Sequence, residues 1–283
     1  MLRNCFLIFF LIFGWKTSFG QNLQKMHIWQ DSLLNLGQKI FATTSEMEKL
    51  ESNFSFVRTL VSSLKEPNSY YYSFDQLKMI SVVNAPDDKF RIFSWNVPLQ
   101  DGSYLYYGAI QLRSGNLKLI PLLDKTFEIK DVDKDVVDNN NWYGAQYYEI
   151  IPFQNNKYIL LGWKGHRADF TQKVIDVLNF DSDDKISFGQ AVFSDKPTLV
   201  RKIFSYNRQA TMILQYNKAN NRIEFDNLVA VEGKEKKDYV PDLSHNAYII
   251  KNNKLLLEEN IEVLNQEGFD LPNSPSKNPK SGL

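Results

Sequence analysis

The strongest constraint on the fold is an element that recurs along the chain: two short runs of β-branched and aromatic residues joined by a turn rich in Asn, Asp, Gly or Lys. This pattern is typical of antiparallel strand pairs. It occurs at residues 81–95, 147–163, 202–216 and 247–259. Further strands are predicted after the first three pairs, at 104–112 with 117–122, at 173–179 with 186–193, and at 222–231. We therefore expect a mainly β, antiparallel protein.

Four antiparallel strands per repeated unit favour a propeller-like arrangement, because a propeller blade has that composition. The repeat is irregular, however. The second strand of each of the first three pairs ends on an aromatic residue, and these residues, Trp95, Trp163 and Tyr216, are 68 and 53 residues apart. An irregular β-sandwich or open meander is therefore the alternative fold.

If the units are equivalent, their three terminal aromatic residues occupy matching positions and are mostly buried. Residues two apart on a strand share a face. The residues two positions before the aromatic ones should therefore lie on the same faces, and all three are large and apolar: Phe93, Leu161 and Leu214. This agreement is the main internal support for a repeated β unit.

Residues 21–66 are predicted to form an antiparallel pair of helices before the β region. The second helix carries an apolar stripe at steps of three and four: Met47, Leu50, Phe54, Val57, Val61 and Leu64. Thr43 and Glu46 match a capping box, and Pro67 ends the helix. Because an apolar stripe must be covered, we expect it to dock on the β region. The alternative is an exposed arm that mediates oligomerisation.

The N-terminal segment has the layout of a secretory signal peptide. Arg3 precedes an unbroken apolar run, and the small residues Ser18 and Gly20 stand at the −3 and −1 positions of a cleavage site before Gln21. We expect an exported protein, periplasmic or extracellular. The expected organisation is a signal peptide, a helical hairpin, a β-repeat domain and a disordered polar tail, at 1–20, 21–66, 67–266 and 267–283.

Several classes of site have no support in the sequence. The only cysteine, Cys5, lies in the signal peptide, so the exported chain has no disulfide or thiolate metal site. The charges balance, with 33 basic and 33 acidic residues, which argues against a nucleic-acid partner. No second apolar run has membrane-spanning length. Asp131, Asp133 and Asp135 lack the Gly and Glu of a calcium loop. We expect no metal and no cofactor.

The segment that follows the strand at 158–163 is the best candidate site. It places a base, two cations and a carboxylate beside an aromatic ring in one loop: Trp163, Lys164, His166, Arg167 and Asp169. Such a loop can bind an anionic ligand. Trp142 and Tyr143 add flat aromatic surfaces, which can stack on a sugar ring or anchor a protein partner.

We therefore predict an exported, non-catalytic binding protein that takes a glycan or an envelope protein on an aromatic face. The alternative is a hydrolase in which Asp169 orients His166 as a general base. No Gly-x-Ser-x-Gly elbow is present. Ser244 and His245 are adjacent, so their side chains point apart. We assign no catalytic residue on these grounds.

Overall fold

The computed structural model describes residues 22–114, 116–165, 169–231 and 238–262, so the predicted signal peptide and polar tail lie outside the described residues. The two predicted helices are confirmed as α1 (Leu23–Ala42) and α2 (Glu46–Leu64). The N-terminus of α2 is capped by Ser45, whose hydroxyl accepts the Glu48 amide. No helix among these residues combines the length and hydropathy needed to cross a membrane.

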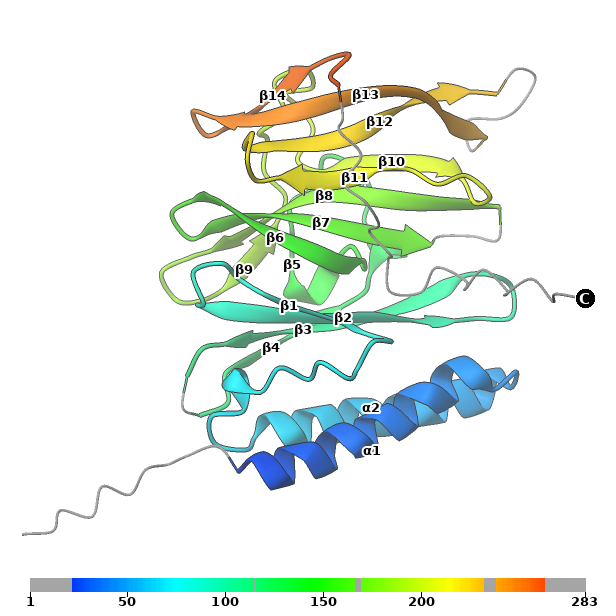
Figure 1. Ribbon diagram of the computed structural model, residues 1–283, viewed down its shortest axis with the longest axis vertical. Coiled ribbons are helices and arrows are strands. Elements are labelled where there is room, and N and C mark those ends of the chain that lie inside the picture. Colours follow the sequence, from blue (N-terminus) through cyan, green and yellow to red (C-terminus); the bar gives the residue numbers. More distant parts are fainter. Residues whose placement is uncertain (1–21, 115, 166–168, 232–237, 263–283) are drawn as a thin grey trace, which may run out of the picture.

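The described strands form three antiparallel sheets (Figure 1). The first sheet is a meander of β1 (Ser81–Asn84), β2 (Phe90–Pro98), β3 (Tyr104–Leu112) and β4 (Leu119–Leu123). The middle sheet has the order β5-β9-β8-β7-β6, with β10 also paired to β8. Its strands are β5 (Val137–Asp138), β6 (Gln146–Gln154), β7 (Lys157–Gly165), β8 (Phe170–Phe180), β9 (Ile186–Phe188) and β10 (Lys202–Asn207). The third sheet is a meander of β11 (Leu214–Asn217), β12 (Arg222–Ala230), β13 (Tyr239–Lys251) and β14 (Lys254–Glu258).

Three short 3₁₀ helices connect these elements, at Ser69–Tyr71, Thr126–Glu128 and Asn139–Asn141. The last two lie in the long connection between β4 and β6. This connection also contains β5, which pairs with β9. Val132 packs against the core. The connection is therefore part of the middle layer.

The helical hairpin and the three sheets stack in four layers along the long axis of the molecule (Figure 1). A core fills each of the three gaps between layers. Alternation along the inner strands divides side chains between two cores: on β7, Leu160 points to the first sheet, whereas Ile159 and Leu161 point to the third. Strands buried on both faces need apolar residues at consecutive positions, which is why 158–161 is continuously apolar.

One predicted strand pair is wrong. The segments 202–206 and 211–216 do not form a hairpin, because β10 pairs with β8 and β11 pairs with β12. The reason lies in the length of β8: β9 pairs only with residues 178–180, which leaves the backbone groups of 170–175 for β10. The chain then crosses from the middle sheet to the third. The other three predicted pairs are confirmed.

The described residues form no closed sheet and no propeller. The expectation that the three terminal aromatic residues occupy equivalent positions is also wrong. Trp95 is buried under the helices, whereas Trp163 and Tyr216 are only half-buried. Leu161 faces the following layer, whereas Phe93 and Leu214 face the preceding one. Sequence alternation identified strand faces but not the layer that each face contacts.

The prediction that α2 docks on the β region through its apolar stripe is also largely wrong. The buried residues of α2 are Asn53, Phe56, Leu60, Ser63 and Leu64, so Leu64 is the one stripe residue among them. Two contacts with the first sheet set this rotation of the helix. Trp95 donates from Nε1 to Asn53 Oδ1 at 2.8 Å, and its ring meets Phe56 edge-on at 5.4 Å between centroids. The N-terminal half of the stripe therefore faces away from the β region.

Candidate functional site

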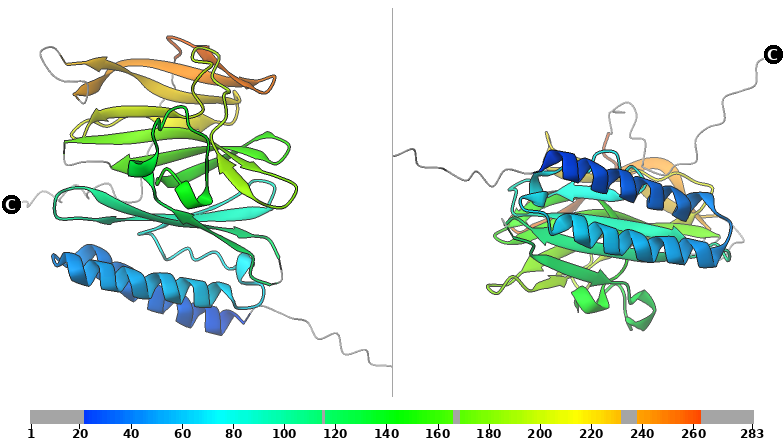
Figure 2. Two further views of the ribbon diagram at one scale, coloured as in Figure 1. Left: turned by 180° about the vertical axis from the view of Figure 1, so that it is seen from behind. Right: turned by 90° about the horizontal axis from the view of Figure 1, so that it is seen from below.

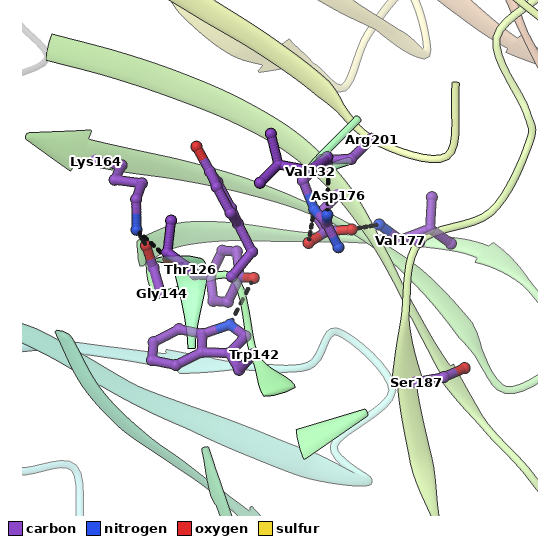
Figure 3. A network of polar contacts seen from close by, with 12 residues as sticks. Thr126, Val132, Trp142, Gly144, Lys164, Asp176, Val177, Ser187 and Arg201 are labelled. Atoms are coloured by element: carbon purple, nitrogen blue, oxygen red, sulfur yellow. Dashed lines mark hydrogen bonds and ion pairs between the residues drawn. The ribbon is translucent and has the colours of Figure 1, made fainter. Parts of the chain in front are cut away.

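Lys164, near the end of β7, belongs to a group of buried polar residues (Figure 3). Its side chain is buried beneath the connection between β4 and β6. The ammonium donates to Thr126 Oγ1 at 2.9 Å and to the Gly144 carbonyl. It also lies over the rings of Tyr106 and Tyr143, at 4.3 and 4.4 Å from their centroids. Burial lowers the pKa of Lys164 to about 8.

A second cation in the network, Arg201, lies opposite Asp176 of β8. Both side chains are completely buried, and Arg201 Nε is 2.7 Å from Asp176 Oδ2. Nη1 donates to the Val132 carbonyl at 2.6 Å, and the guanidinium lies 5.1 Å from the Tyr143 ring centroid. Burial opposes the charge, but the Asp176 carboxylate outweighs burial and raises the pKa of Arg201.

These two cations fix the β4–β6 connection onto the middle sheet. Lys164 holds Thr126 and Gly144, and Arg201 holds Val132. Only glycine fits at position 144, since a Cβ there would come within 2.5 Å of the Asp124 carboxyl carbon. The network therefore supplies hydrogen-bond partners for backbone carbonyls that no strand can pair.

Three of the predicted site residues converge in this network, but inside the protein. Trp142 and Tyr143 are buried with 0% and 2% of their surface exposed, and Lys164 is exposed by 2%. The Trp142 indole donates to the Tyr147 hydroxyl at 3.0 Å, and the Tyr143 hydroxyl donates to Gln172. Their rings present no stacking surface to solvent, so the contacts that the structure gives them are structural.

The remaining predicted residues do not join this group. Trp163 is half-buried and meets the Tyr104 ring edge-on at 5.5 Å between centroids. Asp169 is exposed. His166 and Arg167 lie outside the described residues, so the hydrolase alternative stays a prediction.

The other two histidines form no nucleophile–base pair in the described part of the chain. His27 Nδ1 lies 3.0 Å from the Tyr72 hydroxyl, and His245 Nδ1 lies 2.8 Å from Asp226 Oδ1. The Ser244 hydroxyl donates to Asp242 instead of a histidine. No cluster of three His, Cys, Asp or Glu side chains suitable for a metal ion occurs among the described residues.

A solvent-facing cavity of about 310 Å³ lies where four hairpin turns meet. The turns are those between β1 and β2, β3 and β4, β6 and β7, and β8 and β9, so the cavity joins the first and middle sheets at one end. Its inner wall consists of Phe90, Tyr158 and Phe180. Phe90 lies at the centre of this wall, 4.8 Å from Tyr158 and 5.0 Å from Phe180 between ring centroids. Phe180 is half-buried and the other two rings are buried.

Charged side chains of both signs surround this aromatic wall. Four carboxylates and three cations line the cavity, from Asp87, Asp88, Asp181 and Asp184 and from Lys89, Arg113 and Lys118. Several are fixed by contacts with one another. The Tyr158 hydroxyl donates to Asp87 Oδ2 at 2.6 Å, Lys89 Nζ lies 3.3 Å from that same oxygen, and Arg113 pairs with Asp88 at 2.9 Å.

The carboxylate of Asp87 accepts hydrogen bonds from both Tyr158 and Lys89. Burial by itself would raise the pKa of Asp87, but the hydrogen bonds from Tyr158 and Lys89 outweigh burial and lower it. Asp87 is therefore ionised at neutral pH. Burial, together with the Asp87 charge, raises the pKa of Tyr158, which keeps its hydroxyl protonated as a donor.

Sequence reasoning read Asp87, Asp88, Asn156 and Asp184 of this cavity only as residues of turns between strands, and Phe90 and Tyr158 only as strand residues. That reading is correct for the backbone: Asp88, Asn156 and Asp184 have φ values of 59°, 56° and 60°, in the left-handed region that Asn and Asp tolerate. No sequence signal could unite turns that are separated by up to 97 residues, from Asp87 to Asp184. Comparisons of the chain with protein-family models, with curated proteins and with solved structures find no match.

Proposed function

We propose that this chain is an exported, non-catalytic binding protein, and that the cavity at the four turns binds a neutral, hydroxyl-rich ligand of the carbohydrate class. The observation that carries the proposal is an aromatic wall bordered by side chains of both charges. Export is supported by the signal-peptide layout before Gln21.

The chemistry of the rim favours hydroxyl groups. A hydroxyl donates to a carboxylate and accepts from an ammonium or guanidinium, so one sugar ring can use both kinds of side chain. The apolar C–H face of the ring can pack against the exposed part of Phe180. A strongly anionic ligand would face the four carboxylates, and a strongly cationic one would face Lys89, Arg113 and Lys118.

The size of the cavity limits the ligand. Small-molecule sites usually measure about 300–1,000 Å³, and the cavity of about 310 Å³ lies at the lower end of this range. It suits one or two sugar units, such as the end of a longer glycan. A polymer would extend from the cavity into solvent.

Titration calorimetry of the chain from Gln21 onward with mono- and disaccharides tests the proposal. Asp184→Asn removes a rim charge but keeps a residue that tolerates the left-handed backbone, and we expect it to weaken binding at least tenfold. Asp183→Asn is the matched control, since Asp183 is in the same turn but does not line the cavity. The proposal fails if no saccharide binds, or if the two variants bind equally well.

A further inference from the structure

The uncovered half of the α2 stripe is an exposed apolar surface of the helical hairpin. Met47 and Phe54 are exposed by 69% and 63%, and Leu50 by 37%. The stripe continues through Val57 and Val61, which are half-buried, to Leu64, which is buried. Seen from below, the helical hairpin covers one end of the stack and no described element covers the hairpin (Figure 2).

The spacing of this stripe is that of a coiled-coil seam. Its residues follow one another at steps of 3, 4, 3, 4 and 3, which places them at the alternating a and d positions of successive heptads. A helix that only covers its own domain needs one apolar arc, and α2 already has one in Phe56 and Leu60. Val57 of the second arc packs against the core under the helices. The exposed part of this arc, Met47, Leu50 and Phe54, is left for a helix of another chain.

The charges beside the stripe specify which helix fits. Glu51 and Arg58 are the exposed residues at the e positions, one heptad apart. Neither forms an ion pair within the described part of the chain; Arg58 instead lies 5.7 Å from the Phe54 ring centroid. In an antiparallel coiled coil, e positions face e positions, so a second α2 would bring its Arg58 to Glu51 and its Glu51 to Arg58.

The same register pairs the apolar residues. When Glu51 faces Arg58 of a second copy, Phe54 packs against Val57 and Leu50 against Val61 of that copy. A parallel arrangement would instead place Glu51 beside Glu46 of the second copy, since g and e positions then meet. Like charges at that contact disfavour it. The charge pattern therefore selects an antiparallel pair with two symmetric ion pairs.

We propose that the stripe of Met47, Leu50 and Phe54 is a homodimer interface, in which α2 packs antiparallel against α2 of a second copy. Asn53 and Leu60, which face the first sheet, occupy the g positions. Because g faces g across an antiparallel pair, the two stacks of sheets then lie on the same side of the two α2 helices. A two-fold axis makes every contact occur twice. The turn cavity lies in the gap between the first and middle sheets and is left open, so this inference is independent of the proposed function.

Sedimentation velocity of the chain from Gln21 onward over a concentration series tests the dimer. We expect a dimer for the unmodified chain and a monomer for Phe54→Asp. The circular dichroism spectrum of the variant should be unchanged, because Phe54 is not part of the core. Ser55→Asp, at an exposed position of α2 outside the stripe, is the control and should stay dimeric.

A charge exchange identifies the partner. Glu51→Arg and Arg58→Glu should each weaken the dimer at least tenfold, because each creates two like-charge contacts, and the double variant should restore it. Restoration in the double variant is specific to a second copy, because a different partner would not carry the compensating change. A monomeric unmodified chain, a dimer insensitive to Phe54→Asp, or a double variant as weak as the single ones would each overturn the inference.

Discussion

Two arginines, one in the first sheet and one just before β10, show two ways to hold a buried cation. Arg91 and Arg201 are exposed by 1% and 0%. Arg201 faces the Asp176 carboxylate. Arg91 has no carboxylate partner among the described residues and instead donates from all three nitrogens: to Gln111 at 2.9 Å, and to the Tyr72 and Ser69 carbonyls at 2.5 and 2.8 Å.

The two environments have opposite effects on the charge. Three aromatic rings also face Arg91, those of Tyr70, Phe74 and Phe93, at 4.8–5.4 Å from their centroids. These rings and dipoles do not fully replace water, so burial lowers the pKa of Arg91 to about 9, whereas the Asp176 carboxylate raises that of Arg201. Conversely, Arg201 Nη2 has no hydrogen-bond partner among the described residues. The Arg201 site neutralises the charge of the guanidinium, whereas the Arg91 site gives each guanidinium nitrogen a hydrogen-bond acceptor.

Both arginines do the same structural task. Arg91 binds carbonyls of the segment between α2 and β1, and Arg201 binds a carbonyl of the connection between β4 and β6. None of these carbonyls, from Ser69, Tyr72 and Val132, lies in a strand. A buried guanidinium, which offers five donors, fixes such irregular backbone to a neighbouring sheet.

Removing the counter-ion of Arg201 should have the largest effect on stability. Asp176→Asn keeps the shape and an acceptor for the Val177 amide but leaves the guanidinium buried without a charge partner. We expect a loss of about 3–5 kcal/mol in the free energy of unfolding, measured by urea denaturation. Replacing both residues, as Asp176→Leu with Arg201→Met, should be less harmful than the single change. Equal or greater harm from the double change would show that the charge is not the cause.

Changing the donors of Arg91 should have a smaller effect. Arg91→Lys keeps a positive charge but loses the planar set of donors, so at least one of the Tyr72 and Ser69 carbonyls loses its partner. Each unsatisfied buried group costs about 1–3 kcal/mol, and we expect a loss in this range by the same denaturation assay. A neutral result would mean that the charge and the rings alone hold Arg91, which would weaken the contrast with Arg201.

Lys164 provides an intermediate case that can be titrated. Like Arg91, it has rings and carbonyl groups around it, and its pKa falls from 10.5 to about 8. Above pH 8 the folded protein loses this proton while the unfolded chain keeps it, so the Lys164 contribution to stability rises with pH between about 8 and 10.5. The slope should be on the order of 1.4 kcal/mol per pH unit. Lys164→Met should remove this slope from the difference between the two proteins, and parallel pH curves would contradict the assignment.

The smallest effect is expected at an exposed arginine that has a carboxylate partner. Arg113 and Asp88 are paired at 2.9 Å, but their side chains are exposed by 49% and 51%. Exposed ion pairs contribute about 0–1 kcal/mol, so Arg113→Ala should leave the melting temperature nearly unchanged. A large loss would show that the rim of the cavity contributes to the fold as well as to binding.

The local sequence pattern was sufficient to predict most helices and strands of this protein. The apolar spacing of 47–64 indicated a helix, and α2 spans Glu46–Leu64. The alternating runs located β2, β3, β7 and β14 within a few residues. Each of these features depends on hydrogen bonding or burial within a short stretch of chain, and the sequence of that stretch carries the information.

The sequence by itself thus determined the class of the fold, two helices followed by antiparallel strands, and which residues of each strand share a face. Tertiary structure alone decided that β10 joins β8, that α2 docks through Phe56 instead of Phe54, that Trp142 and Tyr143 are buried, and that four distant turns enclose a cavity. The physical reason is common to all four. Periodicity records that a face is apolar, but the choice among possible partners depends on free strand edges, hydrogen-bond partners and shapes contributed by residues far away in the chain.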